Sequence, residues 1–259
     1  MTSKSSIVFM LSFLILSSGC EPDEKARCYP TRITKKISLG TSTTDIIADY
    51  KYENDTLDRI VRSDYQTHHF EYNDAGYIVK ISRKNRETFQ NHESRLIYDG
   101  ALTVKSDEFL VMLDRFTQED KEVTQTGYRE FVYDGMKVIE ERLFEENDSL
   151  GKMELSVVKE YEYDLSGNII TYVALSQPLN DTLEAFSFTY DSYLNPYSSL
   201  NLIFEGESYI NNVTQKTDLL TGDVYDYQIQ YDHTGYPDQI IIKQESYMLE
   251  IINFEYICR

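Results

Sequence analysis

The segment Phe70-Glu-Tyr-Asn-Asp-Ala-Gly-Tyr-Ile-Val79 contains a complete β-hairpin signal within ten residues. Aromatic and polar residues alternate before Asn73, as in a strand with one buried face. Asn73 and Asp74 are typical residues for the start of a turn, and Gly76 can adopt the positive φ that such turns need. A second β-rich run follows from Tyr77. The segment therefore predicts two antiparallel strands joined by a short turn.

The same pattern occurs eight times along the chain: an aromatic or aliphatic residue, a spacer and a tyrosine, followed in seven copies by an acid or amide. Successive tyrosines are 20 to 41 residues apart, so the repeat is a hairpin with insertions rather than a solenoid of fixed period. Two strands per copy predict an all-β fold, a long antiparallel meander of about 14–16 strands that must curl, split or close into a barrel. Alternation is lost near 196–212, where we expect one short helix or a long loop. The repeat tyrosines are Tyr52, Tyr72, Tyr98, Tyr133, Tyr163, Tyr190, Tyr231 and Tyr256.

Each expected strand has one apolar face and one polar face. Tyr50 and Tyr52, for example, alternate with Asp49, Lys51 and Glu53. A transmembrane barrel needs an apolar belt toward lipid, where a charged residue costs up to about 2–4 kcal/mol at the bilayer midplane. We therefore expect a soluble sheet that buries its aromatic face.

The N-terminus has the plan of a bacterial secretion signal. Only Lys4 is charged before Glu21, and the apolar run 7–16 would span about 15 Å as a helix, half of the hydrocarbon thickness. The run ends in Leu16-Ser-Ser-Gly-Cys20, which resembles the lipobox of lipoproteins. We expect a signal peptide over 1–19, a tether over 20–32 that is lipidated on Cys20, and one β-repeat domain over 33–259. The alternative is an ordinary signal peptide that leaves Cys20 as a thiol.

The composition is acidic, with 25 Lys and Arg against 44 Asp and Glu and a net charge of −19. Such a field repels nucleic acid and anionic lipid, so we expect no nucleic-acid partner and membrane contact through the lipid anchor only. Because 41% of the residues are hydrophobic, the chain can still bury a core. The acidic segment 21–25 resembles a surface-export signal. We expect a monomer anchored to the outer membrane, at the cell surface rather than on the periplasmic face.

The C-terminal half carries a resemblance to a known family. Tyr190-Asp is followed by Asn195-Pro196, then by Asn211-Asn-Val-Thr214, then by Gly235-Tyr-Pro237 and the terminal Phe254-Glu-Tyr256. This series resembles a family of Bacteroidota lipoproteins of uncharacterised function, built from repeats like the YD repeats of cell-surface and toxin proteins. The resemblance implies a porin-like, curled β fold and an envelope location. It supplies no catalytic residues.

Candidate catalytic and metal-binding residues are few. His68 and His69 are adjacent and would point to opposite faces of a regular strand, so one metal cannot take both. Neighbouring acids could supply the two carboxylates of a glycosidase, but 44 acids make such pairs inevitable. The chain has no Gly-x-Ser-x-Gly, P-loop, dinucleotide-binding or zinc-helix motif. We predict no catalytic residue, metal or cofactor. The acidic pairs are Glu119-Asp120, Glu140-Glu141 and Glu145-Glu146.

Three tripeptides resemble the acceptor for protein O-glycosylation in Bacteroidota, an Asp, a Ser or Thr and an aliphatic residue. The acceptor positions would be Thr56, Ser149 and Thr182, each preceded by Asn-Asp. Asn-Asp also opens plain hairpin turns, and both interpretations can hold because a glycan needs an exposed turn.

Once Cys20 carries lipid, the remaining cysteines are Cys28, ahead of the first expected strand, and Cys258, next to last in the chain. If the sheet closes, these two residues meet, and an exported protein permits a disulfide. The alternative is two unpaired thiols at the chain ends.

These features favour a lipid-anchored, non-enzymatic β module that binds or scaffolds at the envelope, with an extracellular glycan or an envelope protein as its ligand. The alternative is a glycan hydrolase that uses a carboxylate pair. Two carboxylates facing each other in a cleft would favour the enzyme, whereas acids scattered over the outer face would favour the binding module.

Overall fold

The computed structural model describes residues 28–39, 42–85, 87–88, 90–113, 120–147, 151–200 and 210–258. The predicted lipidation site Cys20 and glycosylation site Ser149 lie outside these ranges. This part of the chain forms sixteen strands and one short 3₁₀ helix. They are β1 (Cys28–Leu39), β2 (Ser42–Glu53), β3 (Thr56–Arg62), β4 (Gln66–Tyr72), β5 (Ile78–Asn85), β6 (Gln90–Asp99), β7 (Leu102–Leu113), β8 (Asp120–Asp134), β9 (Lys137–Asn147), β10 (Lys152–Tyr163), β11 (Ile169–Ser176), β12 (Thr182–Leu194), η1 (Pro196–Leu200), β13 (Asn211–Asp218), β14 (Val224–Tyr231), β15 (Pro237–Gln244) and β16 (Tyr247–Cys258).

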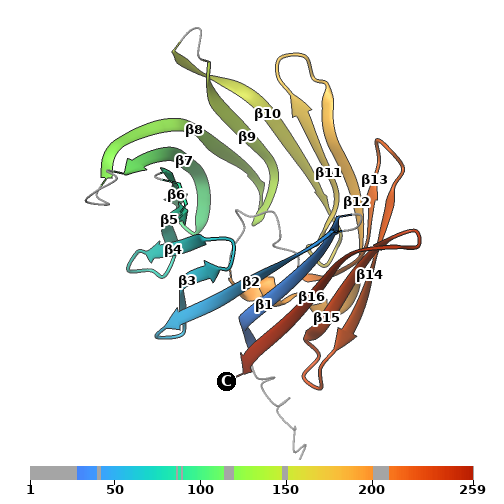
Figure 1. Ribbon diagram of the computed structural model, residues 1–259. Coiled ribbons are helices and arrows are strands. Elements are labelled where there is room, and N and C mark those ends of the chain that lie inside the picture. The colour runs from blue at the N-terminus through green and yellow to red at the C-terminus, as the bar shows by residue number, and fades with distance from the viewer. Residues whose placement is uncertain are drawn as a thin grey trace, which may run out of the picture.

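The strands form a closed antiparallel barrel (Figure 1). Each strand pairs with the next along the chain, and β1 pairs with β16 from Cys28↔Cys258 to Ile37↔Glu250. Closure removes both edges of the sheet, which an open meander of this length would leave unpaired. The predicted all-β meander is confirmed, with the strand number at the top of the expected range. The short helix expected near 196–212 is η1.

The first strand begins earlier than the sequence indicated. We placed the tether over 20–32, but β1 already starts at Cys28. Cys28 is fully buried against β16, Pro30 is fully buried as well, and the Tyr52 hydroxyl donates to the Pro30 carbonyl at 2.8 Å. The end of the expected tether is therefore part of the barrel wall, because the last strand supplies a partner that local sequence does not reveal.

In two repeat copies the acid or amide after the tyrosine holds the turn by side-chain hydrogen bonds. The Asn73 side-chain oxygen accepts hydrogen bonds from the backbone N–H groups of Ala75 and Tyr77, both at 3.0 Å. The Asp232 carboxylate does the same for Thr234 and Tyr236, at 2.8 and 3.1 Å. Gly76 lies at φ +81°, where a side chain would be strained. At these two turns the chemistry expected from sequence is therefore the chemistry observed.

The repeat tyrosines have a common structural role. In seven of them the hydroxyl donates to a backbone carbonyl on the preceding strand, at 2.5 to 2.8 Å. Tyr231 is the exception and donates to the Asp191 carboxylate instead. Burial raises the pKa of Tyr72 and of Tyr163 to about 12. We call these eight residues the tyrosine ring; it follows the end of the barrel that carries the repeat turns, Cys28 and Cys258. The seven carbonyls belong to Pro30, Leu57, Ile78, Thr103, Val138, Ile169 and Pro237.

The barrel interior is filled on one side only. Buried apolar side chains pack together between β16 and β6, and they include Ile81, which is fully buried. Such packing supplies most of the free energy that holds a small sheet together. Among the described residues, the other side of the interior encloses a cavity. The filled half contains Ile33, Tyr50, Leu57, Ile60, Phe70, Ile78, Ile81, Leu96, Ile252 and Phe254.

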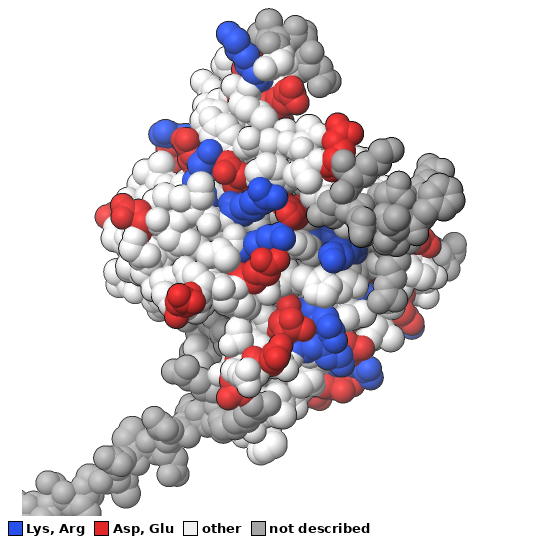
Figure 2. Space-filling view, turned by 90° about the vertical axis from the view of Figure 1, so that its left-hand side faces the viewer, with Lys and Arg blue, Asp and Glu red and all other residues white. Residues whose placement is uncertain are grey.

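The outer face of the wall is charged. Because Ile81 points inward, its neighbour Lys80 points outward, where its ammonium lies 3.0 Å from the Glu71 carboxylate. Figure 2 shows basic and acidic side chains next to one another over the wall that lies on the left in Figure 1. Within the described part of the chain, no helix has the length and apolarity that a membrane crossing requires.

Candidate functional site

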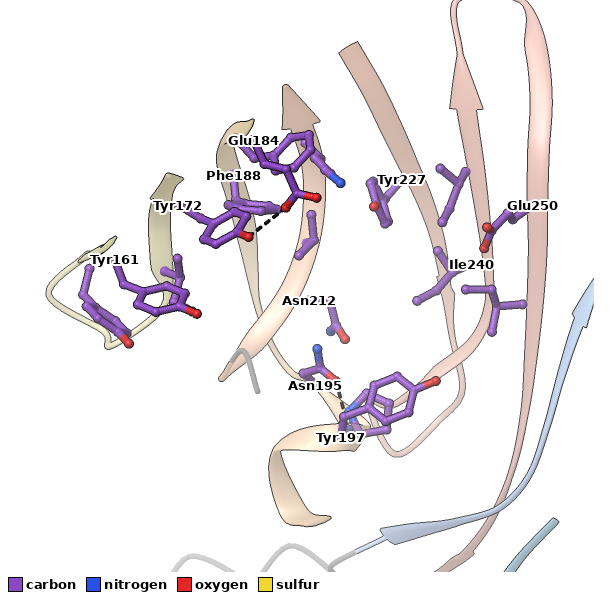
Figure 3. A pocket seen from close by; sticks show the side chains of 18 of the residues that line it. Tyr161, Tyr172, Glu184, Phe188, Asn195, Tyr197, Asn212, Tyr227, Ile240 and Glu250 are labelled. Carbon is purple, nitrogen blue, oxygen red and sulfur yellow. Dashed lines mark hydrogen bonds between the residues drawn. The ribbon is translucent and has the colours of Figure 1, made fainter. Parts of the chain in front are cut away.

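A cavity of about 600 Å³ occupies the hollow half of the barrel. Its walls come from β8 to β16 and from Lys35 of β1, and one end is formed by η1 with the adjoining Asn195 (Figure 3). The volume lies in the range of pockets that hold small molecules, about 300–1,000 Å³.

Four aromatic rings form a row along one wall of the cavity. Tyr161 pairs across β10 and β11 with Tyr172, which pairs across β11 and β12 with Phe186; Phe188 continues the row along β12. Successive ring centroids are 5.6, 6.1 and 6.4 Å apart. We call these residues the aromatic row. The register of the barrel therefore places a continuous set of aromatic side chains along the cavity.

The charged side chains of the cavity are largely paired with one another. Glu141, only 7% exposed, accepts a hydrogen bond from the Tyr161 hydroxyl at 2.8 Å and lies 3.4 Å from the Arg129 guanidinium and 3.7 Å from the Lys159 ammonium. Burial, followed by the charge of Glu141, raises the pKa of Tyr161 well above its usual range. This arrangement satisfies a carboxylate that would otherwise be costly to bury.

The same network continues along the inner wall toward β6. The Arg129 guanidinium lies 3.6 Å from the Glu108 carboxylate, which accepts hydrogen bonds from the hydroxyls of Ser94 and Ser106 at 2.6 and 2.9 Å. The Ser94 hydroxyl accepts in turn from the Arg83 guanidinium at 2.9 Å. Alternating charges thus connect the filled half of the barrel to the cavity.

Two further carboxylates line the cavity. The Glu250 carboxylate lies 3.1 Å from the Lys35 ammonium, across the β1–β16 junction. The Glu184 carboxylate accepts from the Tyr172 hydroxyl at 2.7 Å, at the rim of the aromatic row (Figure 3). Each carboxylate of the cavity is therefore held by at least one donor.

Lys216 of β13 differs from the other two cavity lysines. Its ammonium lies 3.7 Å from the centre of the Phe186 ring and 5.9 Å from that of Tyr225. Burial lowers the pKa of Lys216, although the charges of Glu184 and Asp218 act in the opposite direction. Among the described residues, no carboxylate lies within 4.0 Å of this ammonium.

The η1 end of the cavity is held by a compact set of amide contacts. The Asn195 side-chain oxygen accepts from the Tyr197 backbone N–H at 2.9 Å, and the Tyr197 ring lies 6.1 Å from that of Phe254. Asn212 is 2% exposed, and its backbone N–H donates to the Asp191 carboxylate at 3.2 Å. These contacts fix η1 against the wall below the aromatic row.

The histidines and acidic pairs singled out from sequence do not form a site. His68 is buried inside the barrel wall, whereas its neighbour His69 has the opposite orientation. Glu140 contacts Arg142 on the outer face while Glu141 points inward, so this pair is divided by the wall. Glu145 and Glu146 are exposed, and Glu119 lies outside the described residues. No group of three or more metal-ligating side chains was found within the described ranges.

The two glycosylation candidates that the structure describes lie at hairpin ends. Thr56 and Thr182 are both exposed and stand at the first positions of β3 and β12. Asn54 and Asp55, immediately before Thr56, have φ values of 49° and 63°, as in a tight hairpin turn. Both threonines are therefore accessible to a modifying enzyme, and their glycosylation stays a prediction.

Cys28 and Cys258 are joined by a disulfide in the structure, with their Cα atoms 4.0 Å apart. The closed barrel thus meets the condition that the sequence prediction set, that both chain ends lie together. Oxidation in the native envelope stays a prediction.

Comparisons with known proteins show a shared fold but assign the chain to no family. No family model and no curated protein matches the chain. A crystal structure of a porin-like protein from Bacteroides vulgatus ATCC 8482 is similar over 88% of this chain and 98% of its own, with a TM-score of 0.53 and 13% identity. The two proteins share a fold. A porin-like protein from Bacteroides uniformis ATCC 8492, at 10% identity, covers 88% of this chain and 96% of its own with a TM-score of 0.32. A protein with unknown function from Bacteroides fragilis NCTC 9343, at 13% identity, covers 53% of this chain and 86% of its own with a TM-score of 0.29.

Sequence reasoning missed the residues that distinguish the cavity. The sequence pattern predicts that the aromatic face of the sheet is buried, and it singles out neither Lys216 nor Asn212. The only available signal was the Asn211-Asn-Val-Thr214 stretch, which the family resemblance singled out without giving it a role.

Proposed function

We propose that this chain is a lipid-anchored, non-enzymatic envelope module that binds an extracellular glycan inside its barrel. The observation that carries the proposal is the aromatic row, which faces a cavity that also presents charged and amide groups. Sugars have apolar ring faces that stack on aromatic side chains and hydroxyl groups that need hydrogen-bond partners. A cavity with only apolar walls would suit a lipid better.

The placement of the chain ends supports an outward-facing cavity. Cys28 and Cys258 lie at the tyrosine-ring end of the barrel, the end that η1 closes. If Cys20 carries lipid, the eight residues from there to Cys28 reach at most about 29 Å when fully extended. The opposite end of the barrel would then point away from the membrane, toward molecules outside the cell.

A glycan hydrolase is the second candidate, because Glu141, Glu184 and Glu250 all line the cavity. A retaining or inverting glycosidase needs two carboxyl groups free to act on one sugar bond, about 5–10 Å apart. Here Glu141 is engaged by two cations and a phenol, Glu250 by Lys35, and Glu184 by Tyr172. These engagements favour binding over hydrolysis.

The test is calorimetric titration of the full mature protein in detergent with a panel of oligosaccharides. We expect at least one to bind, and Phe188→Ala to weaken that binding about fivefold or more, since a lost stacking contact costs about 1 kcal/mol. Tyr247→Ala is the matched control, because Tyr247 is 70% exposed and lies outside the cavity.

Three results would contradict the proposal. They are failure of every oligosaccharide to bind, equal weakening by both variants, and release of new reducing ends during incubation. The last would favour the hydrolase. Binding of an envelope protein to the outer face with no glycan in the cavity would favour a scaffolding role instead.

A further inference from the structure

We propose that the glycan is acidic: an oligosaccharide whose carboxylate pairs with Lys216 and whose hydroxyl group donates to the Asn212 side-chain oxygen. The inference rests on the proposed glycan-binding function and specifies its ligand. Two cavity groups carry it. Among the described residues, the Lys216 ammonium has no carboxylate within 4.0 Å, and the Asn212 side-chain oxygen has no hydrogen-bond donor.

The first is the Lys216 ammonium. Lys35 and Lys159 lie 3.1 and 3.7 Å from the carboxylates of Glu250 and Glu141, respectively. Lys216 projects into the same cavity, where its ammonium lies against aromatic rings; among the described residues, Glu184 and Asp218 act on its charge only from beyond 4.0 Å. A half-buried ammonium has lost part of its hydration, so a carboxylate at this position would gain a charge-assisted hydrogen bond at a low cost in desolvation.

The second is the side-chain oxygen of Asn212. The amide nitrogen donates toward three acceptors, the Asp191 carboxylate and the carbonyls of Tyr193 and Leu194, at 3.2 to 3.5 Å. A flipped amide would turn its oxygen toward these three acceptors, so the orientation of the group is fixed by its surroundings. The oxygen is buried, and no donor among the described residues reaches it. An unsatisfied buried acceptor costs about 1–3 kcal/mol, which a ligand hydroxyl would offset.

The spacing of the two groups sets the length of the ligand. Asn212 and Lys216 are four residues apart on β13, at most about 13 Å along the strand because the pairing with β12 is irregular between them. This separation exceeds the width of one sugar ring. Phe186, which contacts Lys216, belongs to the aromatic row on the neighbouring strand β12. A chain of rings can therefore stack on the row while it meets both polar groups.

The other charges of the cavity distinguish an acidic sugar from a fatty acid. An alkyl chain would cover the Glu141–Lys159 and Glu250–Lys35 pairs and offer them no hydrogen bond, which is unfavourable for charged groups. Sugar hydroxyls can both donate to the carboxylates and accept from the ammonium groups. We therefore commit to a uronic-acid oligosaccharide.

The test compares acidic sugars with their neutral esters and with a fatty acid. The full mature protein in detergent is titrated with trimers of galacturonate, mannuronate and glucuronate, with their methyl esters and with dodecanoate. We expect at least one acid trimer to bind at least tenfold more tightly than its neutral ester, a difference of about 1.4 kcal/mol. Lys216→Gln should abolish this preference, and Lys216→Arg should retain most of it. Lys152→Gln removes the same charge from an exposed strand end and should leave the preference unchanged.

Each alternative result has a distinct meaning. Equal binding of acid and ester overturns the acidic-ligand inference and leaves the glycan-binding function standing. A preference that survives Lys216→Gln with an unchanged thermal transition also overturns the inference. Tighter binding of dodecanoate than of any sugar overturns both proposals. In a structure of the complex, a ligand hydroxyl must lie within hydrogen-bond distance of the Asn212 oxygen; a carboxylate group there instead would refute the assigned orientation.

Discussion

Reduction of the Cys28–Cys258 disulfide should lower the stability of the barrel substantially. The bond closes a loop over a sequence separation of 230 residues. In the chain-entropy model a loop of this length restricts the unfolded chain by an equivalent of about 5 kcal/mol, an upper figure because real bridges deliver less. For a domain of this size, 5 kcal/mol corresponds to a fall in Tm of about 10–20 °C.

The assay is urea unfolding followed by circular dichroism, with the oxidised protein, the same protein in reductant, and the Cys28→Ser/Cys258→Ser variant. Reductant isolates the covalent bond, whereas the variant also places a hydroxyl where the fully buried Cys28 side chain was. Coincident midpoints with and without reductant would refute the expected contribution. Peptide mapping of the exported protein without reduction must show the cross-linked peptides, and two freely alkylated cysteines would refute the bond itself.

Cys20→Ala should remove a diacyl or triacyl lipid and release the protein from the membrane fraction; an unmodified N-terminus on the native protein in mass spectrometry would contradict this prediction. Thr56→Ala and Thr182→Ala should each lower the intact mass in the native host by one glycan, and a native mass of peptide plus lipid alone would rule out the modification. Alkali should destabilise the barrel above pH 10, because folding raises the pKa of Tyr72 and of Tyr163 from 10.0 to about 12. Their stabilising contribution is complete below pH 10 and is lost as the pH rises toward 12, while the unfolded chain ionises first. Phenolate absorbance and circular dichroism should change together, and full ionisation near pH 10 in an intact barrel would contradict this assignment.

The fold could be predicted from sequence to the level of strand pairs and turns. The repeat places Asn73 three residues before Gly76, which suits a short hairpin turn, and the same spacing separates Asp164 from Gly167 and Asp232 from Gly235. Closure depended on a contact between residues 230 positions apart, which no local pattern encodes. The start of β1 was missed for the same reason, since its partner strand is the last in the chain.

The cavity could not be predicted, because filled and hollow halves of the barrel share one pattern. Phe70 and Tyr72 belong to the same repeat as Phe188 and Tyr190, yet Phe70 packs in the core and Phe188 lines the cavity. Strict alternation also does not hold along β13, because its pairing with β12 shifts between Thr189 and Tyr190.

The pairing of β1 with β16 also sets an order for folding. Every other pair in the barrel joins neighbouring strands, so hairpins can form one after another along the chain. β1 keeps one unpaired edge until β16 has formed and paired with it. The incomplete sheet is therefore exposed to pairing with other chains until β16 is in place. Lys35 and Lys36 lie in β1, where charged side chains oppose the pairing of its open edge with other chains.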